Sequence, residues 1–227
     1  MWARKGEALA SVLPVGGEIW GERGTSAPSG LYPVVIKPAF DRVIGLALLI
    51  LFSPVILASA LAVLVTMGGP VFYSQERIGL GGRAFRLYKI RTMIPDRRVG
   101  QDAYSGAERR LVHKSVDDPR VTLVGKVLRA TRFDELPQFL NVVKGEMSMV
   151  GPRPELPEIV RRYEPWQHDR HLVKPGVTGP WQVSNHNGDL MYQHTEIDLE
   201  YLEQISFPHD LGILIRTPMA MVGRKGH

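Results

Sequence analysis

Two adjacent carboxylates, Asp134 and Glu135, are the residues of this 227-residue chain best suited to chemistry. The sequence predicts a helix over residues 134–145, because aspartate is a good N-cap residue and a first turn tolerates the proline at position 137. The positive end of the helix dipole would keep the carboxylate of Asp134 ionised. An ionised carboxylate that is held in place can act as a nucleophile, although a solvated helix start is the commoner role of such a pair.

Basic side chains elsewhere in the chain could hold phosphate groups beside these carboxylates. Arg153 lies in a loop stiffened by two prolines, and such a loop by itself is usually a surface turn. Arg129 is a candidate phosphate ligand, but positive charge at a membrane interface is its commoner role. Phosphoryl transfer needs a nucleophile, a cation that neutralises oxygens and basic donors, so the residues together favour that chemistry. The candidate substrate-binding residues are Arg77, Lys89, Arg91, Arg129, Pro152, Arg153 and Pro154.

Several other chemistries are excluded or disfavoured. The chain has no cysteine, which excludes disulfides, thiolate zinc sites and cysteine nucleophiles. A serine hydrolase elbow is absent from the sequence, and the glycines of residues 79–82 lack the full dinucleotide-binding spacing. His168 and His171 share a helix face but lack a third ligand at a zinc spacing, and residues 117–120 fit a turn better than a metal-binding loop.

Residues 43–67 form an uncharged, strongly apolar run that is long enough to reach across roughly 30 Å of hydrocarbon. Basic residues flank both of its ends, so the positive-inside rule places both ends in the cytoplasm. Ser53 and Pro54 lie mid-run, where the proline kinks a helix and the serine hydroxyl can bond a freed carbonyl. Residue physics alone leaves a kinked spanning helix and a re-entrant helix both open.

The net charge of +5 also belongs to this region, because the excess of basic residues lies within residues 37–100. A nucleic-acid-binding protein would carry its basic surface on the soluble part instead. We therefore expect three parts: a flexible tail over residues 1–36, a membrane anchor kinked at Ser53-Pro54 over 37–67, and a cytoplasmic domain over 68–227. The fold class expected is α+β and mainly helical.

Local patterns predict the elements of this domain. A glycine cluster between residues 71–73 and 84–88 is typical of a short hairpin. An apolar stripe from about residue 121 predicts an amphipathic helix that could rest on a membrane surface. Polar helices are expected over residues 156–173 and 190–206, whereas the apolar residues 211–222 suit either core packing or interfacial insertion.

The order of these segments resembles the bacterial sugar transferases known as monotopic polyprenyl-phosphate phosphoglycosyl transferases, in their minimal catalytic-domain form. The resemblance covers residues 37–223, and its most specific part is residues 134–154. The matching segments are KPAFD at 37–41, SP at 53–54, YKIRTM at 88–93, DPR at 118–120, DELPQ at 134–138, NVVKGEMSMVGPRP at 141–154 and KPGVTG at 174–179.

This resemblance implies an enzyme that moves a sugar 1-phosphate from a nucleotide diphosphate sugar, with uridine as the expected base, to polyprenyl (undecaprenyl) phosphate. Asp134 would attack the sugar-bearing phosphorus and release UMP, Glu135 would help to hold Mg²⁺, and Arg153 would bind substrate. The family's Ser-Pro kink makes the anchor re-entrant. Such an enzyme starts exopolysaccharide, lipopolysaccharide or glycoconjugate synthesis on the cytoplasmic face of the bacterial inner membrane.

The chain departs from the family pattern at two places. His186 stands near the position of an arginine that often follows the Gln-Val pair, and it would be a weaker, pH-dependent phosphate ligand. Arg132 and Phe133 replace a small or polar residue and a leucine before the carboxylate pair. Neither change alters Asp134 or Glu135.

Partners expected beyond the two substrates are anionic lipids of the membrane, a second copy of the chain and downstream glycosyltransferases. The alternative function is a noncatalytic, membrane-anchored adaptor of a glycan-assembly complex. Substitution of Asp134 separates the two functions, because only an enzyme depends on this carboxylate.

Overall fold

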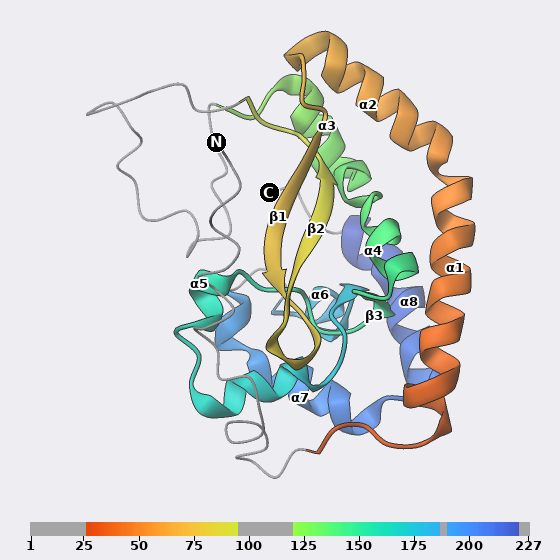
Figure 1. Cartoon of the computed structure of the whole chain (residues 1–227), viewed down its shortest axis with the longest axis vertical. Helices are drawn as coiled ribbons and strands as arrows, with labels where there is room; N and C mark the ends of the chain where they lie inside the picture. Colours follow the sequence, from red (N-terminus) through yellow and green to blue (C-terminus); the bar gives the residue numbers. More distant parts are fainter. Residues whose placement is uncertain (1–25, 95–119, 187–189, 223–227) are drawn as a thin grey trace.

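A computed structural model describes residues 26–94, 120–186 and 190–222 of the chain, and the predicted mainly helical α+β class is confirmed for these residues. Most of the expected tail and the DPR segment up to Pro119 lie outside the described residues. In Figure 1, α1 and α2 form an arc along one edge of the molecule, and a long hairpin of β1 and β2 crosses its middle beside α3 and α4.

The described elements follow in chain order, with η marking 3-10 and π segments. They are η1 (Tyr32–Ile36), α1 (Lys37–Leu51), α2 (Ser53–Met67), β1 (Phe72–Ile78), η2 (Leu80–Gly82), β2 (Ala84–Ile90), α3 (Leu123–Thr131), η3 (Phe133–Glu135), α4 (Gln138–Lys144), β3 (Ser148–Val150), α5 (Pro157–Val160), η4 (Pro165–Leu172), β4 (Gly176–Thr178), α6 (Pro180–Val183), η5 (Met191–Gln193), α7 (Thr195–Gln204) and α8 (Phe207–Val222). β1 pairs with β2 antiparallel, whereas β3 pairs with β4 in parallel.

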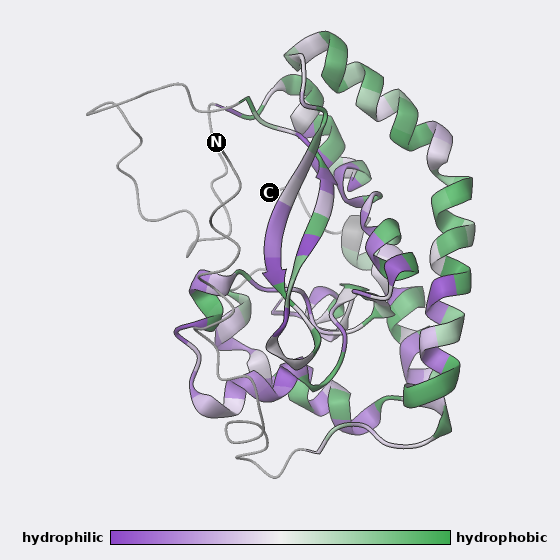
Figure 2. Ribbon diagram, viewed as in Figure 1, coloured by the Kyte–Doolittle hydropathy of each residue, from purple (hydrophilic) through white to green (hydrophobic). Residues whose placement is uncertain are grey.

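The predicted apolar run folds as two helices that are bent by 55° at Phe52. The hydroxyl of Ser53 donates to the carbonyl oxygen of Ile50 at 2.8 Å, so a carbonyl near the break is satisfied locally. No single described helix is long and apolar enough to cross a membrane, but η1 and α1 together with α2 pass that test as a bent pair. In Figure 2 most of this arc has the green colour of hydrophobic residues.

A buried polar cluster fixes the start of this arc to the body of the protein. The ammonium group of Lys37 lies 2.7 Å from Asp210 on α8, and the hydroxyl of Tyr201 donates to the same carboxylate at 2.7 Å. One turn further along α1, Asp41 accepts a hydrogen bond of 2.6 Å from Ser148 on β3. Because η1 leads directly into α1, residues 32–36 of the expected tail are helical instead.

The hairpin is confirmed, and it is fastened to α4 by one buried amide. The side-chain nitrogen of Asn141 donates to the carbonyl oxygen of Arg86 and to Glu146, both at 2.7 Å, and its oxygen accepts from the amide of Tyr88 at 3.2 Å. The amide is fully buried. The main apolar core lies around this contact and is formed by Leu87, Phe139, Val142, Met147, Met149, Val150, Tyr201, Leu202 and Ile213.

The helix predictions after residue 155 are partly wrong. Residues 156–173 form two short elements, α5 and η4, because Pro165 begins a new helical segment that is capped by Glu164 and Gln167. Residues 190–206 divide in the same way into η5 and α7. In α8, Ile213 is buried in the core whereas Ile215 is 61% exposed, so this helix packs on one face and leaves an apolar face open.

Replacing Asn141 by alanine should lower the free energy of unfolding by about 2–3 kcal/mol, because a backbone carbonyl and a backbone amide of β2 lose their partner in a buried place. Chemical denaturation in detergent micelles measures this value. The exposed Asn185→Ala is the control, and a loss within about 0.5 kcal/mol of that control would show that the clamp contributes nothing.

Candidate active site at the Asp134–Glu135 turn

The two carboxylates lie in a 3-10 turn between α3 and α4, so the prediction that a helix begins at Asp134 is wrong. Pro137 has no N–H to donate to the carbonyl of Phe133, and the α-helical hydrogen bonds therefore begin only after it, with α4 at Gln138. Arg132, which ends α3, has φ 61° and is the only non-glycine residue with positive φ in the described parts of the chain. This left-handed residue turns the backbone sharply just before Asp134.

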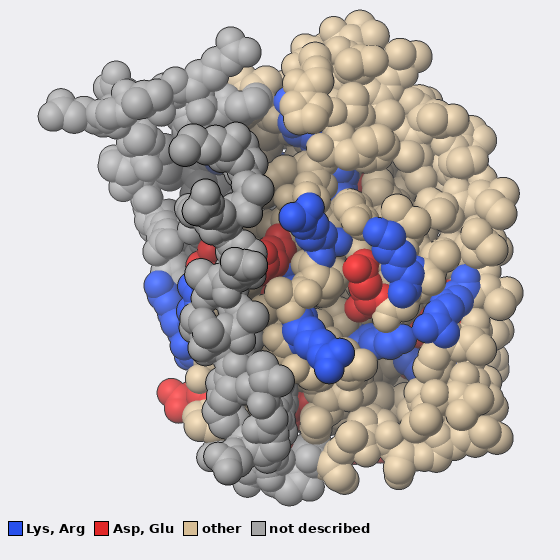
Figure 3. Space-filling view, in the orientation of Figure 1, with Lys and Arg blue, Asp and Glu red and all other residues tan. Residues whose placement is uncertain are grey.

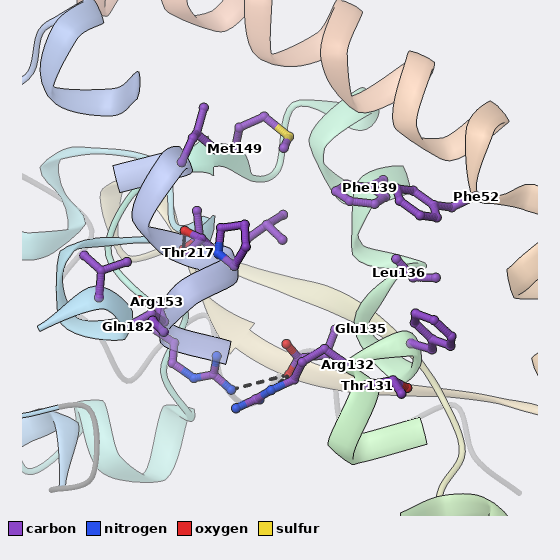
Figure 4. Close-up of a pocket in the computed structure, with 17 residues that line it drawn as sticks. Phe52, Thr131, Arg132, Glu135, Leu136, Phe139, Met149, Arg153, Gln182 and Thr217 are labelled. Atoms are coloured by element: carbon purple, nitrogen blue, oxygen red, sulfur yellow. Dashed lines mark hydrogen bonds and ion pairs between the residues drawn. The ribbon is translucent and has the colours of Figure 1, made fainter. Parts of the chain in front are cut away.

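Glu135 is surrounded by cations from three separate segments. Its Oε1 atom lies 2.8 Å from Lys89 Nζ on β2, 3.5 Å from a guanidinium nitrogen of Arg153 and 3.8 Å from one of Arg132. Figure 4 shows the side chains of Arg132 and Arg153 ending close together beside Glu135. Burial by itself raises the pKa of Glu135, but Lys89, Arg153 and Arg132 outweigh it and hold the pKa below the usual range. Glu135 therefore stays ionised.

Asp134 has the opposite electrostatic situation. Its side chain is buried, and its Oδ1 atom has no hydrogen-bond partner among the described residues. Burial, and next the charge of Glu135, raise the pKa of Asp134 to about 6, against the opposing effects of Lys89, Arg132 and Arg129. We expected a helix dipole to favour the ionised form of Asp134, but in the structure desolvation of this carboxyl group favours its protonated form. A desolvated carboxylate that is still ionised at neutral pH, with one oxygen unpaired, is suited to nucleophilic attack.

Two buried arginines hold the loop that carries Arg153. Arg77 donates to the carbonyl oxygen of Pro154 at 3.1 Å, and Arg170 donates to the carbonyl oxygen of Arg153 at 2.9 Å. Arg170 is itself paired with Asp198 at 2.7 Å. Arg77 therefore positions the loop, and burial lowers its pKa more strongly than the neighbouring Glu155 raises it. Sequence reasoning missed Arg170 and Asp198, because nothing local distinguishes them from other charged residues of polar segments.

Arg91 does not join this cluster. Its guanidinium group donates to the carbonyl oxygens of Met67, Gly68 and Gly69, and so it caps the end of α2. The structure therefore gives this residue a positioning role, and the substrate contact expected from the sequence stays a prediction.

Arg129 is bonded to the segment that follows β2, where its Nε donates to the hydroxyl of Thr92 at 2.9 Å. It also lies close enough to Asp134 to lower the pKa of that carboxyl group. Gly125 allows α3 to come this near: a Cβ atom there would lie 2.0 Å from the carbonyl oxygen of Thr92. Figure 3 shows the result at the surface, where basic side chains gather around acidic ones in the middle of one face.

A cavity of about 320 Å³ opens beside the turn. Arg132, Glu135 and Arg153 line its charged part, and Phe52, Phe139 and Met149 contribute to an apolar remainder (Figure 4). Phe52 lies at the break between α1 and α2, next to Ser53 and Pro54, and its ring stacks on Phe139 with a centroid distance of 6.3 Å. The kink of the apolar segment and Glu135 thus border one cavity, which the sequence did not predict.

Histidines do not form a metal site in the described ranges, where no group of three or more His, Asp or Glu side chains is placed to hold a metal ion. His168 and His171 lie with ring centroids 6.3 Å apart, and burial lowers the pKa of His171 well below its usual value. His186 lies near the sequence position at which the family pattern often has an arginine. Its ring stacks on that of His194, with a centroid distance of 4.2 Å. A divalent cation at this turn could use the carboxylate of Glu135, since Mg²⁺ needs only one or two carboxylates when phosphates supply further ligands.

Comparison with known proteins gives a consistent picture. Residues 32–224 match the family described as bacterial sugar transferase. The exopolysaccharide production protein ExoY of Rhizobium meliloti is 37% identical over 213 residues, which cover 90% of this chain and 92% of ExoY. The undecaprenyl-phosphate galactose phosphotransferase of Salmonella typhimurium and the UDP-N-acetylgalactosamine-undecaprenyl-phosphate N-acetylgalactosaminephosphotransferase of Aeromonas hydrophila are also 37% identical. They match 84% and 86% of this chain, which spans 41% and 45% of their own lengths.

The two carboxylates should affect stability with opposite signs. Because the pKa of Asp134, about 6, lies above the unfolded value near 4, its ionisation destabilises the fold at neutral pH and has no effect below about pH 4. Asp134→Asn should therefore raise the free energy of unfolding at pH 7.5 by something of the order of 2 kcal/mol. Glu135→Gln should lower it, since the pKa of Glu135 is depressed in the fold.

Denaturation of both variants at pH 7.5, in the same detergent, measures the pair. The gain of Asp134→Asn should shrink as the pH falls from about 6 to about 4, where Asp134 becomes protonated in both states. Equal destabilisation by the two substitutions would contradict the opposite environments of these neighbours.

Proposed function

Because the chain belongs to the bacterial sugar transferase family, we propose that it transfers a sugar 1-phosphate from a nucleotide diphosphate sugar to undecaprenyl phosphate. Names of the relatives support both substrates, since the Aeromonas hydrophila protein is named for a UDP-sugar and for undecaprenyl phosphate. The galactose, N-acetylgalactosamine and glucose named among the relatives differ, so the sugar itself is left open. The product would initiate a bacterial exopolysaccharide or another surface glycan.

The observation that carries the proposal is the buried, unpaired oxygen of Asp134 beside a cluster of cations. An oxygen of Asp134 attacks the sugar-bearing phosphorus of the donor. The bond from this phosphorus to the bridging oxygen breaks, and the electron pair leaves with UMP. The acceptor phosphate then attacks the same phosphorus, and the carboxylate of Asp134 leaves unchanged. Each step forms one P–O bond and breaks another, so no further reactant is needed.

The charged side chains around the turn suit both steps. Arg153 and Arg132 lie where phosphoryl oxygens would pass, and they can oppose the negative charge that gathers there. Lys89 holds Glu135 in place and also lowers the pKa of Asp134. Glu135 would help to hold Mg²⁺, which when bound neutralises the diphosphate of the donor. Arg77 and Arg170 keep Arg153 in position through its loop.

A covalent route also fits the two solvents from which the substrates come. The donor is water-soluble and the acceptor is a lipid, and an enzyme that carries the phosphosugar on Asp134 need not bind both at once. A bent apolar helix pair close to the turn would place the carboxylates at the level of lipid headgroups. We propose that this pair is re-entrant, and that the protein lies on the cytoplasmic face of the inner membrane.

Turnover should depend on Asp134. Protein in nanodiscs, mixed with undecaprenyl phosphate, Mg²⁺ and a panel of UDP-sugars, should release UMP with one of the sugars and form a lipid-linked diphosphate sugar. Asp134→Asn should reduce this rate by at least ~10³-fold, because the attacking group is lost. Glu203→Gln, which changes an exposed carboxylate on α7, is the matched control.

Three results would contradict the proposal. Release of UDP would mean ordinary glycosyl transfer, and near-normal turnover by Asp134→Asn would remove the nucleophile. Vesicle binding without turnover over the whole panel would favour the noncatalytic adaptor instead.

The re-entrant anchor can be tested with single cysteines, since the chain has none of its own. Ser29→Cys and Tyr73→Cys place exposed thiols before and after the bent pair. A membrane-impermeant maleimide should label both in inverted inner-membrane vesicles and neither in intact spheroplasts. Labelling of one position from the outer side would show that the segment crosses the membrane.

A further inference from the structure

The cavity beside the carboxylate turn combines two kinds of surface. Its larger part is apolar and comes from distant elements: the helix break at Phe52, α4 at Phe139, β3 at Met149, and α8 at Leu214 and Ala220. Two of its polar groups, the hydroxyls of the threonines at positions 178 and 217, bond to each other at 2.7 Å. This apolar part is therefore better suited to hydrocarbon than to the polar edge of a nucleobase.

The charged part of the cavity can bind an anion. The guanidinium groups of Arg132 and Arg153 approach Glu135 only at 3.8 and 3.5 Å, and neither donates a hydrogen bond to any residue that the structure describes. Each side chain is 29% exposed, so its N–H groups can be reached from the cavity. Guanidinium groups pair well with phosphate oxygens. The cavity thus offers a phosphate site at one side and an apolar pocket at the other.

A second hollow lies next to this cavity. The groove between α2 and α3 has a volume of about 630 Å³, and its lining carries no charged residue. Phe133, the residue before Asp134, lines both the groove and the cavity. Val55 and Ala58 of α2 form part of the groove wall. A long hydrocarbon chain that passed Phe133 would reach this groove and run along α2, whereas the groove alone has no group for a phosphate.

We propose that the cavity seats the isoprenoid units nearest the phosphate of the lipid acceptor, with that phosphate on Arg132 and Arg153. This inference rests on the proposed function, because it assigns the second substrate of that reaction to particular residues. Arg132 then acts on the phosphate directly, although the family pattern has no arginine at this position. Phe133 becomes the wall over which the chain passes toward the membrane. The donor nucleoside binds outside this cavity.

Bulky substitutions that fill the cavity test the assignment. Ala220→Phe on α8 and Val183→Phe on α6 each add a ring to the lining at partly exposed positions. Met219→Phe is the matched control, because Met219 neighbours Ala220 on α8, is 65% exposed and does not line the cavity. Two rates are compared in nanodiscs: the burst of UMP without acceptor, which reports attack by Asp134, and steady turnover with undecaprenyl phosphate.

Both cavity variants should keep the wild-type burst, which also shows that they are folded, while KM for undecaprenyl phosphate rises at least about tenfold, or ~1.4 kcal/mol. Met219→Phe should change neither rate. A smaller burst with unchanged KM for the lipid would overturn the assignment and give the cavity to the donor. An unchanged UMP burst together with an unchanged KM for undecaprenyl phosphate would overturn the assignment as well. Absence of any burst in the wild type would instead refute the covalent reaction on which the assignment depends.

Discussion

The contacts of Glu135 hold the candidate active site together. Its largely buried carboxylate forms ion pairs with Lys89 on β2, with Arg132 at the end of α3 and with Arg153 after β3. A buried carboxylate without such partners would cost several kcal/mol of desolvation, so the fold tolerates Glu135 only while these side chains stay in place. One ionised group thereby fixes the hairpin, the carboxylate turn and the Pro-Arg-Pro loop relative to one another.

The same cluster explains why Asp134 can remain reactive. Its neighbour attracts the cations, while Asp134 is left buried, with a raised pKa and an oxygen that no described residue satisfies. The left-handed backbone of Arg132 adds local strain two residues before Asp134. Functional sites commonly store such costs, because a fully satisfied carboxylate would be a poor nucleophile. The ionised form of Glu135 therefore raises the free energy of unfolding at neutral pH, whereas the ionised form of Asp134 lowers it.

A second polar cluster joins this site to the apolar arc. Lys37 at the start of α1 pairs with Asp210 on α8, and Asp41 is bonded to Ser148 on β3. These contacts hold the bent helix pair against the core, which brings Phe52 at the helix break onto the cavity beside Glu135. The region suited to lipid and the region suited to phosphate are therefore parts of one rigid arrangement, as a transfer between water and membrane requires.

The sequence by itself determined the hairpin, the kinked apolar segment and the identity of the carboxylates and most of the basic residues, because each depends on neighbours within a few positions. Tertiary structure decided what those residues do. The helix expected at Asp134 begins later, Arg91 caps α2 instead of joining the site, and Arg170 supports Arg153 from a segment that showed no local signal. Lys89 and Glu135 are 46 residues apart, and Lys37 and Asp210 are 173 apart. Burial and pairing over such separations set the pKa of each carboxylate, and local sequence patterns carry no information about either.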